Sequence, residues 1–209
     1  IITTGRNAER VAATQADGFE VIATDLSTPA GVDALIAAVA GRPIDLLINN
    51  AGSGTDHDFR AAAPDVAAAD ACIFLNLNAP IHLITALMPL LRSRPEAMIV
   101  NVTSGLAMAP NAGGAVYCAT KAALRSYTLS LRAQLAGTAI HVLEVLPPVV
   151  ETKMTAGRES GKMPPEECVR QAIVAMERGA RQANVGMVKL LQVVNSLSPA
   201  LARAVMIRF

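Results

Sequence analysis

A tyrosine and a lysine stand four residues apart, at Tyr117 and Lys121, in the run Tyr-Cys-Ala-Thr-Lys. On a helix this spacing is about one turn, so both side chains lie on one face. A nearby ammonium group stabilises a phenolate and therefore lowers the pKa of a tyrosine from its usual value of about 10. Such a tyrosine can exchange protons near neutral pH, which is general acid–base chemistry. The pattern alone is a weak signal, because it occurs by chance in many chains.

Ser104 adds a hydroxyl group to this pair. It follows an apolar run at residues 97–103, which we predict to be a strand, and it lies 13 residues before Tyr117. That length allows the chain to fold back and bring the hydroxyl beside the phenol.

Two groups of amides complete the candidate chemistry. The turn Asn49-Asn50-Ala51-Gly52 follows an apolar run at residues 44–48, and small residues there would let a flat ring approach the backbone closely. Asn76 lies within a long apolar helix that we predict at residues 65–91. A buried amide in such a helix needs hydrogen-bond partners.

These residues stand on a chain in which apolar bursts alternate with helical stretches. Nearly all-apolar strands are buried on both faces, and their alternation with helices makes them parallel. The sequence therefore predicts an α/β fold, a doubly wound parallel sheet in three layers, as one domain over residues 1–209. We predict strands at residues 20–25, 44–48, 97–103, 140–146 and 185–191, helices at 65–91 (interrupted at Pro80 and stopped near Pro89), 115–135 and 166–178, and helix starts at Thr28-Pro29 and Ser198-Pro199.

Composition excludes several classes of protein. With 52% apolar and 17% charged residues the chain is not intrinsically disordered. A net charge of +1 gives no field for nucleic acid, and six aromatic residues are too few for base stacking. The chain has no uninterrupted apolar run of about 18 residues, so we expect no membrane span. Three cysteines without a paired spacing suggest reduced thiols in a cytoplasm. His57, His82 and His141 share no metal-ligand spacing, so we expect no metal.

The order and spacing of five motifs resemble the short-chain dehydrogenase/reductase family, the single-domain branch with a Rossmann fold. The resemblance covers essentially the whole chain. The motifs are Asn49-Asn50-Ala51-Gly52, Asn76, Ser104, Tyr117-x-x-x-Lys121 and Pro147…Thr152.

The resemblance implies four catalytic roles. Tyr117 would be the general acid–base, giving its proton to a carbonyl oxygen in reduction and taking it back in oxidation. Lys121 would lower the pKa of that tyrosine and hold the nicotinamide ribose. Ser104 would donate a hydrogen bond to the substrate oxygen. Asn76 would hold a water in a proton relay towards Lys121.

The resemblance also implies a cofactor cleft at the strand ends. Its lining would come from Asp25 and Leu26 beside the adenine, from Asn50, Ala51 and Gly52, and from Pro147, Val149 and Thr152 towards the nicotinamide. Arg6 stands after the second strand, where a carboxylate would suit NAD. A guanidinium suits a 2′-phosphate, so we expect NADP rather than NAD. Arg6 as a merely solvated charge stays open.

Three features depart from the family pattern. The glycine-rich TGxxxGxG turn is absent, which fits a missing N-terminal segment: residues 1–4 would then be the family's second strand, and the first βα unit is missing. Pro147-Pro148 replaces the usual Pro-Gly, and the tail carries Val188-Lys189-Leu190-Leu191 in place of the glycine pair with which many members end. The tail and the Pro-Pro are similar to an oxidoreductase subgroup named for its proximity to D-alanine-transfer genes, a label that says little about substrate.

We therefore expect a cytoplasmic NADP-dependent carbonyl reductase or alcohol dehydrogenase acting on a small molecule. Residues 152–165 would form a lid, in which Met154 and Met163 either line the substrate pocket or pack the loop. The two long helices would pair copies into a homodimer or homotetramer. A non-catalytic nucleotide sensor or interaction protein on the same fold is the alternative, although a sensor needs no acid–base. An extended-branch epimerase would need a longer region after Thr152.

Overall fold

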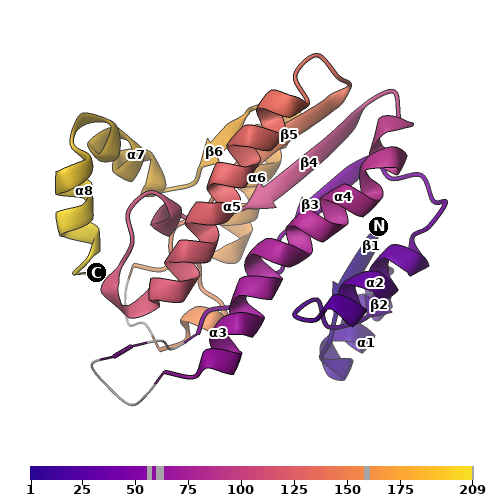
Figure 1. Cartoon of the computed structure of the whole chain (residues 1–209), viewed down its shortest axis with the longest axis horizontal. Coiled ribbons are helices and arrows are strands. Elements are labelled where there is room, and N and C mark those ends of the chain that lie inside the picture. Colours follow the sequence, from indigo (N-terminus) through magenta and orange to yellow (C-terminus); the bar gives the residue numbers. More distant parts are fainter. Residues whose placement is uncertain (56–57, 60–63, 158–160, 209) are drawn as a thin grey trace.

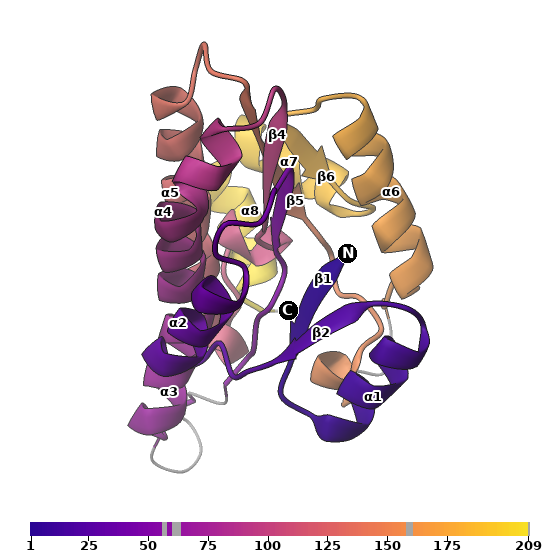
Figure 2. The ribbon, with the colours of Figure 1, turned by 90° about the vertical axis from the view of Figure 1, so that its right-hand side faces the viewer.

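A computed structural model describes residues 1–55, 58–59, 64–157 and 161–208. Its central strands lie between α3, α4 and α5 on one face and α6 on the other, so the protein has three layers (Figures 1 and 2). The elements are β1 (Ile2–Gly5), α1 (Ala8–Ala16), β2 (Glu20–Ala23), α2 (Pro29–Ala38), β3 (Leu46–Asn49), α3 (Val66–Ile73), a π-helical turn (Phe74–Asn78), α4 (Ala79–Arg92), β4 (Ala97–Val102), α5 (Ala115–Gln134), β5 (Ile140–Leu146), α6 (Pro165–Glu177), β6 (Gln182–Asn184), α7 (Val188–Leu197) and α8 (Pro199–Met206), with short 3₁₀ turns at Gly105–Ala107, Ala112–Gly114 and Lys153–Thr155.

All strand pairs are parallel, which confirms the predicted α/β class. The strands form two hydrogen-bonded groups, β1-β2 and β3-β4-β5-β6, and no ladder joins β1 to β3 among the residues that the structure describes. A doubly wound sheet places its first strand between the second and the fourth. If β1 corresponds to the second strand of such a sheet, as the sequence predicts, the break between β1 and β3 lies where the first strand would stand.

Three apolar clusters hold the layers together. Leu83 and Leu87 of α4 pack with Val32 and Leu35 of α2, and Ile84 and Leu91 of α4 pack with residues of β4, α5 and β5. On the opposite face, Leu143 and Val145 of β5 pack with the half-buried side of α6. The apolar residues of α4 recur at helical spacing, so this one helix contributes side chains to two of the clusters.

The prediction that the strand at 44–48 is buried on both faces is wrong for two of its residues. Leu46 and Ile48 are 42% and 48% exposed. Both point to the same face of β3 because side chains alternate along a strand. Leu47, on the other face, packs against α2 and α4. No helix among the described residues covers the Leu46 side.

The predicted last strand at 185–191 is wrong over its whole length. The strand β6 ends at Asn184, and the helix α7 begins at Val188. Between them Gly186 adopts a left-handed conformation with φ +54°, which turns the chain. Short apolar runs do not distinguish a strand from a buried helix face, which explains the error.

Helix boundaries follow local signals closely. The Thr28 side chain accepts a hydrogen bond from Gly31 N, and that of Ser198 accepts one from Leu201 N, so both predicted helix starts are confirmed. Pro89, however, does not stop α4, which continues to Arg92. The turn that begins at Pro89 is still closed by a hydrogen bond from Ser93 N to Pro89 O at 3.2 Å.

One described helical run, Val66–Arg92, is long and apolar enough to cross a membrane by length and composition alone. Leu75, Leu83 and Leu87 of this run are buried in the protein core. Core helices of α/β layers pass the same test, so the run carries little weight as a membrane segment.

Candidate active site

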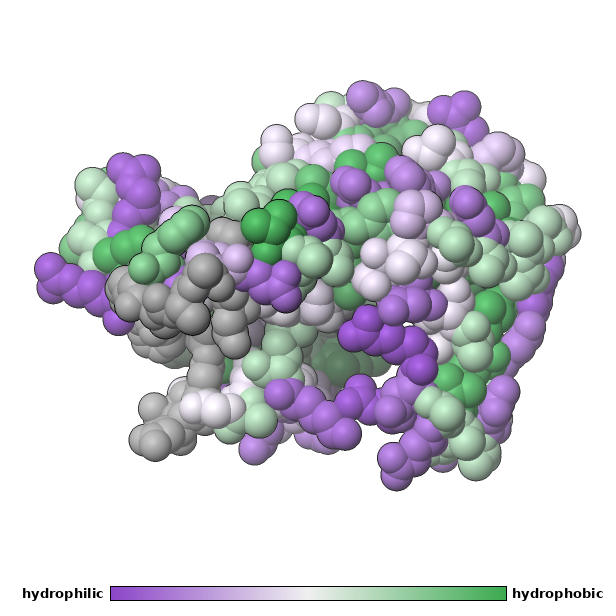
Figure 3. Space-filling view, turned by 60° about the horizontal axis from the view of Figure 1, so that its bottom comes forward, coloured by the Kyte–Doolittle hydropathy of each residue, from purple (hydrophilic) through white to green (hydrophobic). Residues whose placement is uncertain are grey.

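The carboxyl ends of the parallel strands point towards the lower left in Figure 1 and form one edge of the sheet. Side chains that follow parallel strands are brought together at such an edge. Figure 3 shows that the face formed by this edge is hollowed, with hydrophilic residues on its rim. Ser104, after β4, and Asn50, after β3, both stand at this edge, and the amino-terminal part of α5 lies beside them.

Lys121 is a buried cation beside Tyr117. Its Nζ lies 5.8 Å from the centre of the Tyr117 ring, and it donates a hydrogen bond to Val102 O at 2.9 Å. The side chains come together because both stand on one face of α5, as predicted. Burial lowers the pKa of Lys121 to about 8, against an opposing contribution from the nearby Cys72 thiol.

Asn76 is fully buried in the π-helical turn between α3 and α4. Its Oδ1 accepts a hydrogen bond from Ser53 N at 2.9 Å, and its Nδ2 donates to Ser53 O at 2.8 Å and to Thr120 Oγ1 at 3.1 Å. The side chain therefore joins the turn after β3 to the helix that carries Tyr117. π-Helical turns occur often at functional sites.

Gly52 shows how closely these groups approach each other. A Cβ built on Gly52 would lie 3.1 Å from Asn76 Oδ1 and 3.4 Å from Lys121 Nζ. The structure thus brings the Asn50–Gly52 turn, Asn76 and Lys121 into one place, as the sequence predicted.

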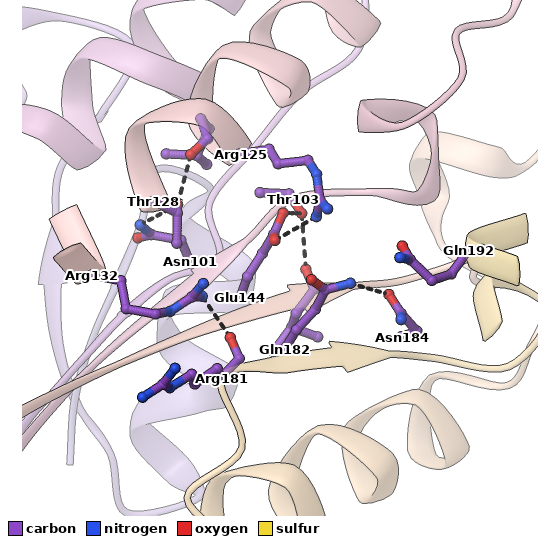
Figure 4. A network of polar contacts seen from close by, with 12 residues as sticks. Asn101, Thr103, Arg125, Thr128, Arg132, Glu144, Arg181, Gln182, Asn184 and Gln192 are labelled. Atoms are coloured by element: carbon purple, nitrogen blue, oxygen red, sulfur yellow. Dashed lines mark hydrogen bonds and ion pairs between the residues drawn. The ribbon is translucent and has the colours of Figure 1, made fainter. Parts of the chain in front are cut away.

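The position of the Asn50 turn is fixed by a buried chain of amides. Asn49 Nδ2 donates to Asn101 Oδ1 at 2.8 Å, and Asn101 Nδ2 donates to the Thr128 hydroxyl at 2.9 Å. This chain links β3 through β4 to α5, and its Asn101–Thr128 part is visible in Figure 4. Asn50 itself and Ala51 are exposed at the strand edge.

Ser104 is buried at the end of β4, where it caps the short turn Gly105–Ala107. Its Oγ accepts a hydrogen bond from Leu106 N at 3.1 Å. This turn packs against α5. Gly105 N donates to Pro147 O at 3.0 Å, which holds the end of β4 against the end of β5. The hydroxyl thus reaches the same strand edge as Lys121.

Arg6 and Asp25, both expected at the cofactor, contact each other. Arg6 Nη1 lies 3.1 Å from Asp25 Oδ2, and the two side chains are 64% and 40% exposed. Hydrogen bonds from Ser27, first from its backbone N–H, lower the pKa of Asp25, with Arg6 contributing less. Leu26, the expected neighbour of the adenine, is buried in the core with Val32.

The remaining predicted residues follow β5. Val149 is half-buried and its carbonyl accepts a hydrogen bond from Met163 N at 2.8 Å, while Thr152 is exposed and caps the turn Lys153–Thr155. Met163 packs with the cluster beneath α6, so of its two predicted roles the structure shows loop packing. Met154 is exposed. Residues 158–160 of the predicted lid lie outside the described residues.

Sequence patterns did not point to three groups that build this site: Ser53, Cys72 and Thr120. The Cys72 thiol donates to Ser53 O at 3.2 Å and accepts from Asn76 Nδ2 at 3.3 Å. Burial raises its pKa, while Ser53 and Lys121 oppose that rise. The only local signal was the i, i+4 spacing of Cys72 and Asn76 on one helix face.

Within the described part of the chain, no group of three or more His, Cys, Asp or Glu side chains is arranged to hold a metal ion. Of the three histidines, His57 lies outside the described residues. His82 packs edge-on against Phe74, and His141 Nε2 contacts Ala180 O at 2.7 Å.

Comparison with known proteins places this geometry in a family. The model of the short chain dehydrogenase family matches residues 1–162. The chain is 47% identical over 109 residues to an uncharacterized oxidoreductase, DltE, of Bacillus subtilis, and 35% identical over 168 residues to serine 3-dehydrogenase of Agrobacterium fabrum. The crystal structure of a short chain dehydrogenase from Burkholderia cenocepacia in complex with NADP is similar with a TM-score of 0.84 at 26% identity, covering 97% of this chain and 84% of that one.

These sequence matches take in 52% and 77% of this chain, and they span 43% of DltE and 66% of the serine dehydrogenase. The family model nevertheless extends from β1 to the loop before α6, through Asn76, Ser104, Tyr117 and Lys121. The chain therefore belongs to the short-chain dehydrogenase family.

Proposed function

We propose that this protein transfers a hydride between NADP(H) and a small carbonyl or alcohol substrate, with Tyr117 as the general acid–base. The observation that carries the proposal is the buried ammonium group of Lys121 beside the Tyr117 ring. A buried cation is costly unless it has partners or a function. Here the cation faces a phenol whose ionised form it would stabilise.

The residues at the strand edge fit an extended dinucleotide. Three residues stand at the carboxyl ends of parallel strands: Gly5 ends β1, Asp25 follows β2, and Gly52 follows β3. Gly52 has no side chain, so it leaves space beside Lys121. The chain would hold the nicotinamide half through Lys121, Asn50 and Val149, and the adenosine half through Arg6 and Asp25. The bound cofactor would supply the hydride chemistry.

The chain's own residues would handle the proton. In the reductive direction Tyr117 would give its phenolic proton to the carbonyl oxygen of the substrate, and Lys121 would stabilise the resulting phenolate. The Ser104 hydroxyl would donate a hydrogen bond to the same oxygen. Asn76 accepts a hydrogen bond from Ser53 N and donates one to Ser53 O. These bonds would keep the π-helical turn in place, and with it the water of the proposed relay.

We infer NADP rather than NAD as the preferred cofactor. A guanidinium at Arg6 can bind a 2′-phosphate, whose charge would compete with the Asp25 carboxylate for it. The related structure from Burkholderia cenocepacia contains NADP. The proposed place of action remains the cytoplasm, with copies pairing through α4 and α5.

The test is a fluorescence titration of the full-length protein with NADPH and, separately, with NADH, followed by a panel of aldehydes and ketones. We expect tighter binding of NADPH and turnover of at least one carbonyl compound. Binding of NADPH without turnover on any compound would favour the nucleotide-sensing alternative. Tighter binding of NADH would contradict the role given to Arg6.

A further inference from the structure

Glu144 is a fully buried carboxylate in the middle of β5. Its two oxygen atoms are held by two different elements, as Figure 4 shows. Oε1 accepts a hydrogen bond from the Thr103 hydroxyl at 2.8 Å, and Oε2 accepts one from Arg125 Nη1 at 2.6 Å. One carboxylate therefore ties β5 both to the end of β4 and to α5.

Each partner of Glu144 stands next to a residue of the candidate active site. Thr103 directly precedes Ser104 in the chain. Arg125 follows Lys121 by four residues, so Tyr117, Lys121 and Arg125 lie on successive turns of one face of α5. The carboxylate lies behind the site and contacts both of the elements that form it.

A contribution to stability does not by itself explain the buried ion pair of Glu144 and Arg125. The side chain of Glu144 is 0% exposed and that of Arg125 is 19% exposed, so both charges lose most of their hydration. Replacing a buried ion pair with apolar residues of similar size is often neutral or stabilising. A buried pair is better explained when it fixes one arrangement of the elements that it joins.

We propose that Glu144 and Arg125 are positioning residues. Together with the Thr103 hydroxyl, their ion pair fixes the face of α5 that carries Tyr117 and Lys121 relative to the end of β4 that carries Ser104. The inference rests on the proposed function, since this spacing matters only if the three groups act on one substrate.

The expected size of the effect follows from the second link between the same elements. Lys121 Nζ also bonds Val102 O, so loss of the ion pair shifts the helix rather than releasing it. A misplacement of about 1 Å can cost a rate on the order of 100-fold. For a smaller shift we expect kcat to fall about 10-fold. The KM for NADPH should change less, because most of the proposed cofactor contacts lie outside α5.

The variants separate position from charge. Thr103→Val removes a hydroxyl without changing any charge, Arg125→Met removes the cation, and Arg125→Lys keeps a cation that can still make one contact. The matched control is Arg132→Met on the same helix. Arg132 bonds Val142 O at 3.0 Å and Arg181 O at 2.6 Å, away from Ser104. We expect lower kcat in Thr103→Val and Arg125→Met, partial recovery in Arg125→Lys, and wild-type kcat in the control.

A second measurement needs no substrate. The chain has two tyrosines and no tryptophan, so in a Tyr127→Phe background the near-ultraviolet absorbance of tyrosinate reports Tyr117 alone. Tyr117 and Lys121 stand on one helix face, so loss of a tether between this face and β4 should leave their separation, and therefore the titration midpoint, unchanged in Thr103→Val. Arg125→Met and Glu144→Gln also change a charge, which itself moves a tyrosine pKa, so Thr103→Val carries this measurement.

Wild-type kcat in both Thr103→Val and Arg125→Met would overturn the proposal. A shifted midpoint in Thr103→Val would also overturn it, because the fall in kcat would then come from an altered Tyr117 pKa and not from the position of the helix face relative to Ser104. Absence of turnover in the wild-type protein would count against the proposed function instead.

Discussion

At the scale of single residues, burial determines the chemistry of Lys121. Its ammonium group has one hydrogen bond to Val102 O and lies beside the Tyr117 ring, and burial brings its pKa down to about 8. The group is still charged at neutral pH, which the proposed proton transfer requires. Burying this charge therefore costs stability below pH 8.

This cost predicts a pH dependence of stability. Between pH 8 and the ordinary Lys121 pKa of 10.5 the unfolded chain binds more protons at this residue than the folded protein, so its contribution to stability rises with pH. Relative to Lys121→Met, the free energy of unfolding of the wild type should rise by roughly 3 kcal/mol across this range. Denaturant unfolding at several pH values measures it. Parallel curves for the two proteins would refute the assigned burial of charge.

At the scale of elements, the site depends on how closely the turn after β3 approaches α5. Gly52 is the point of closest approach, because an added Cβ would press on Asn76 and Lys121. Gly54, two residues later, has open space around its Cβ position. The two glycines therefore form a matched pair.

We expect Gly52→Ala to lower kcat about 10-fold, because neighbours must move by a few tenths of an ångström at the site. Gly54→Ala should retain wild-type kcat. Steady-state kinetics with any accepted carbonyl compound, alongside melting temperatures, make the comparison. Equal kcat values for both variants would mean that the turn does not need to approach Lys121 so closely.

The sequence predicted elements well where the signals were local. The Thr28 and Ser198 caps, the strand at 140–146 and the shared face of Tyr117 and Lys121 all follow from spacing along the chain. The helix α7 was missed because its apolar run is too short to show a period.

Partner choice could not be predicted in the same way. A glutamate in an apolar strand signals a buried polar contact, but only the fold shows that Glu144 is held by Thr103 and Arg125. Similarly, an amide in an apolar helix signals a need for partners, and the structure supplies Ser53 and Thr120 for Asn76. These partners come from distant parts of the chain.

At the scale of the whole molecule, the two strand groups differ in how well they are buried. The described helix α1 contains no buried residue, and the strands β1 and β2 are at most half-buried. In contrast, Ile99, Val100 and Leu143 of the group β3 to β6 are almost fully buried. Leu46 and Ile48 are exposed on β3, the strand beside the break between the groups. Their exposure depends on which elements pack next to β3, and the sequence of the strand itself does not encode those neighbours.

Hydrogen exchange of the 209-residue chain should reveal this difference. Regions with few buried apolar contacts open with low free energy, so amides of β1, α1 and β2 should exchange faster than those of β4 and β5. Mass spectrometry of peptides after exchange resolves the two groups. Equal protection in both would show that the described break does not divide the stability of the molecule.

The most direct test of the central claim is the turnover rate of Tyr117→Phe with NADPH and an accepted carbonyl compound, compared with Tyr127→Phe. Loss of the acid–base should cost on the order of 100-fold to 10,000-fold in kcat while NADPH binding is retained. Tyr127→Phe should stay near the wild type, because Tyr127 is half-buried against the apolar cluster that α4, α5, β4 and β5 form. If Tyr117→Phe turns over as fast as the wild type, the phenol beside Lys121 does not move the proton and the account is contradicted.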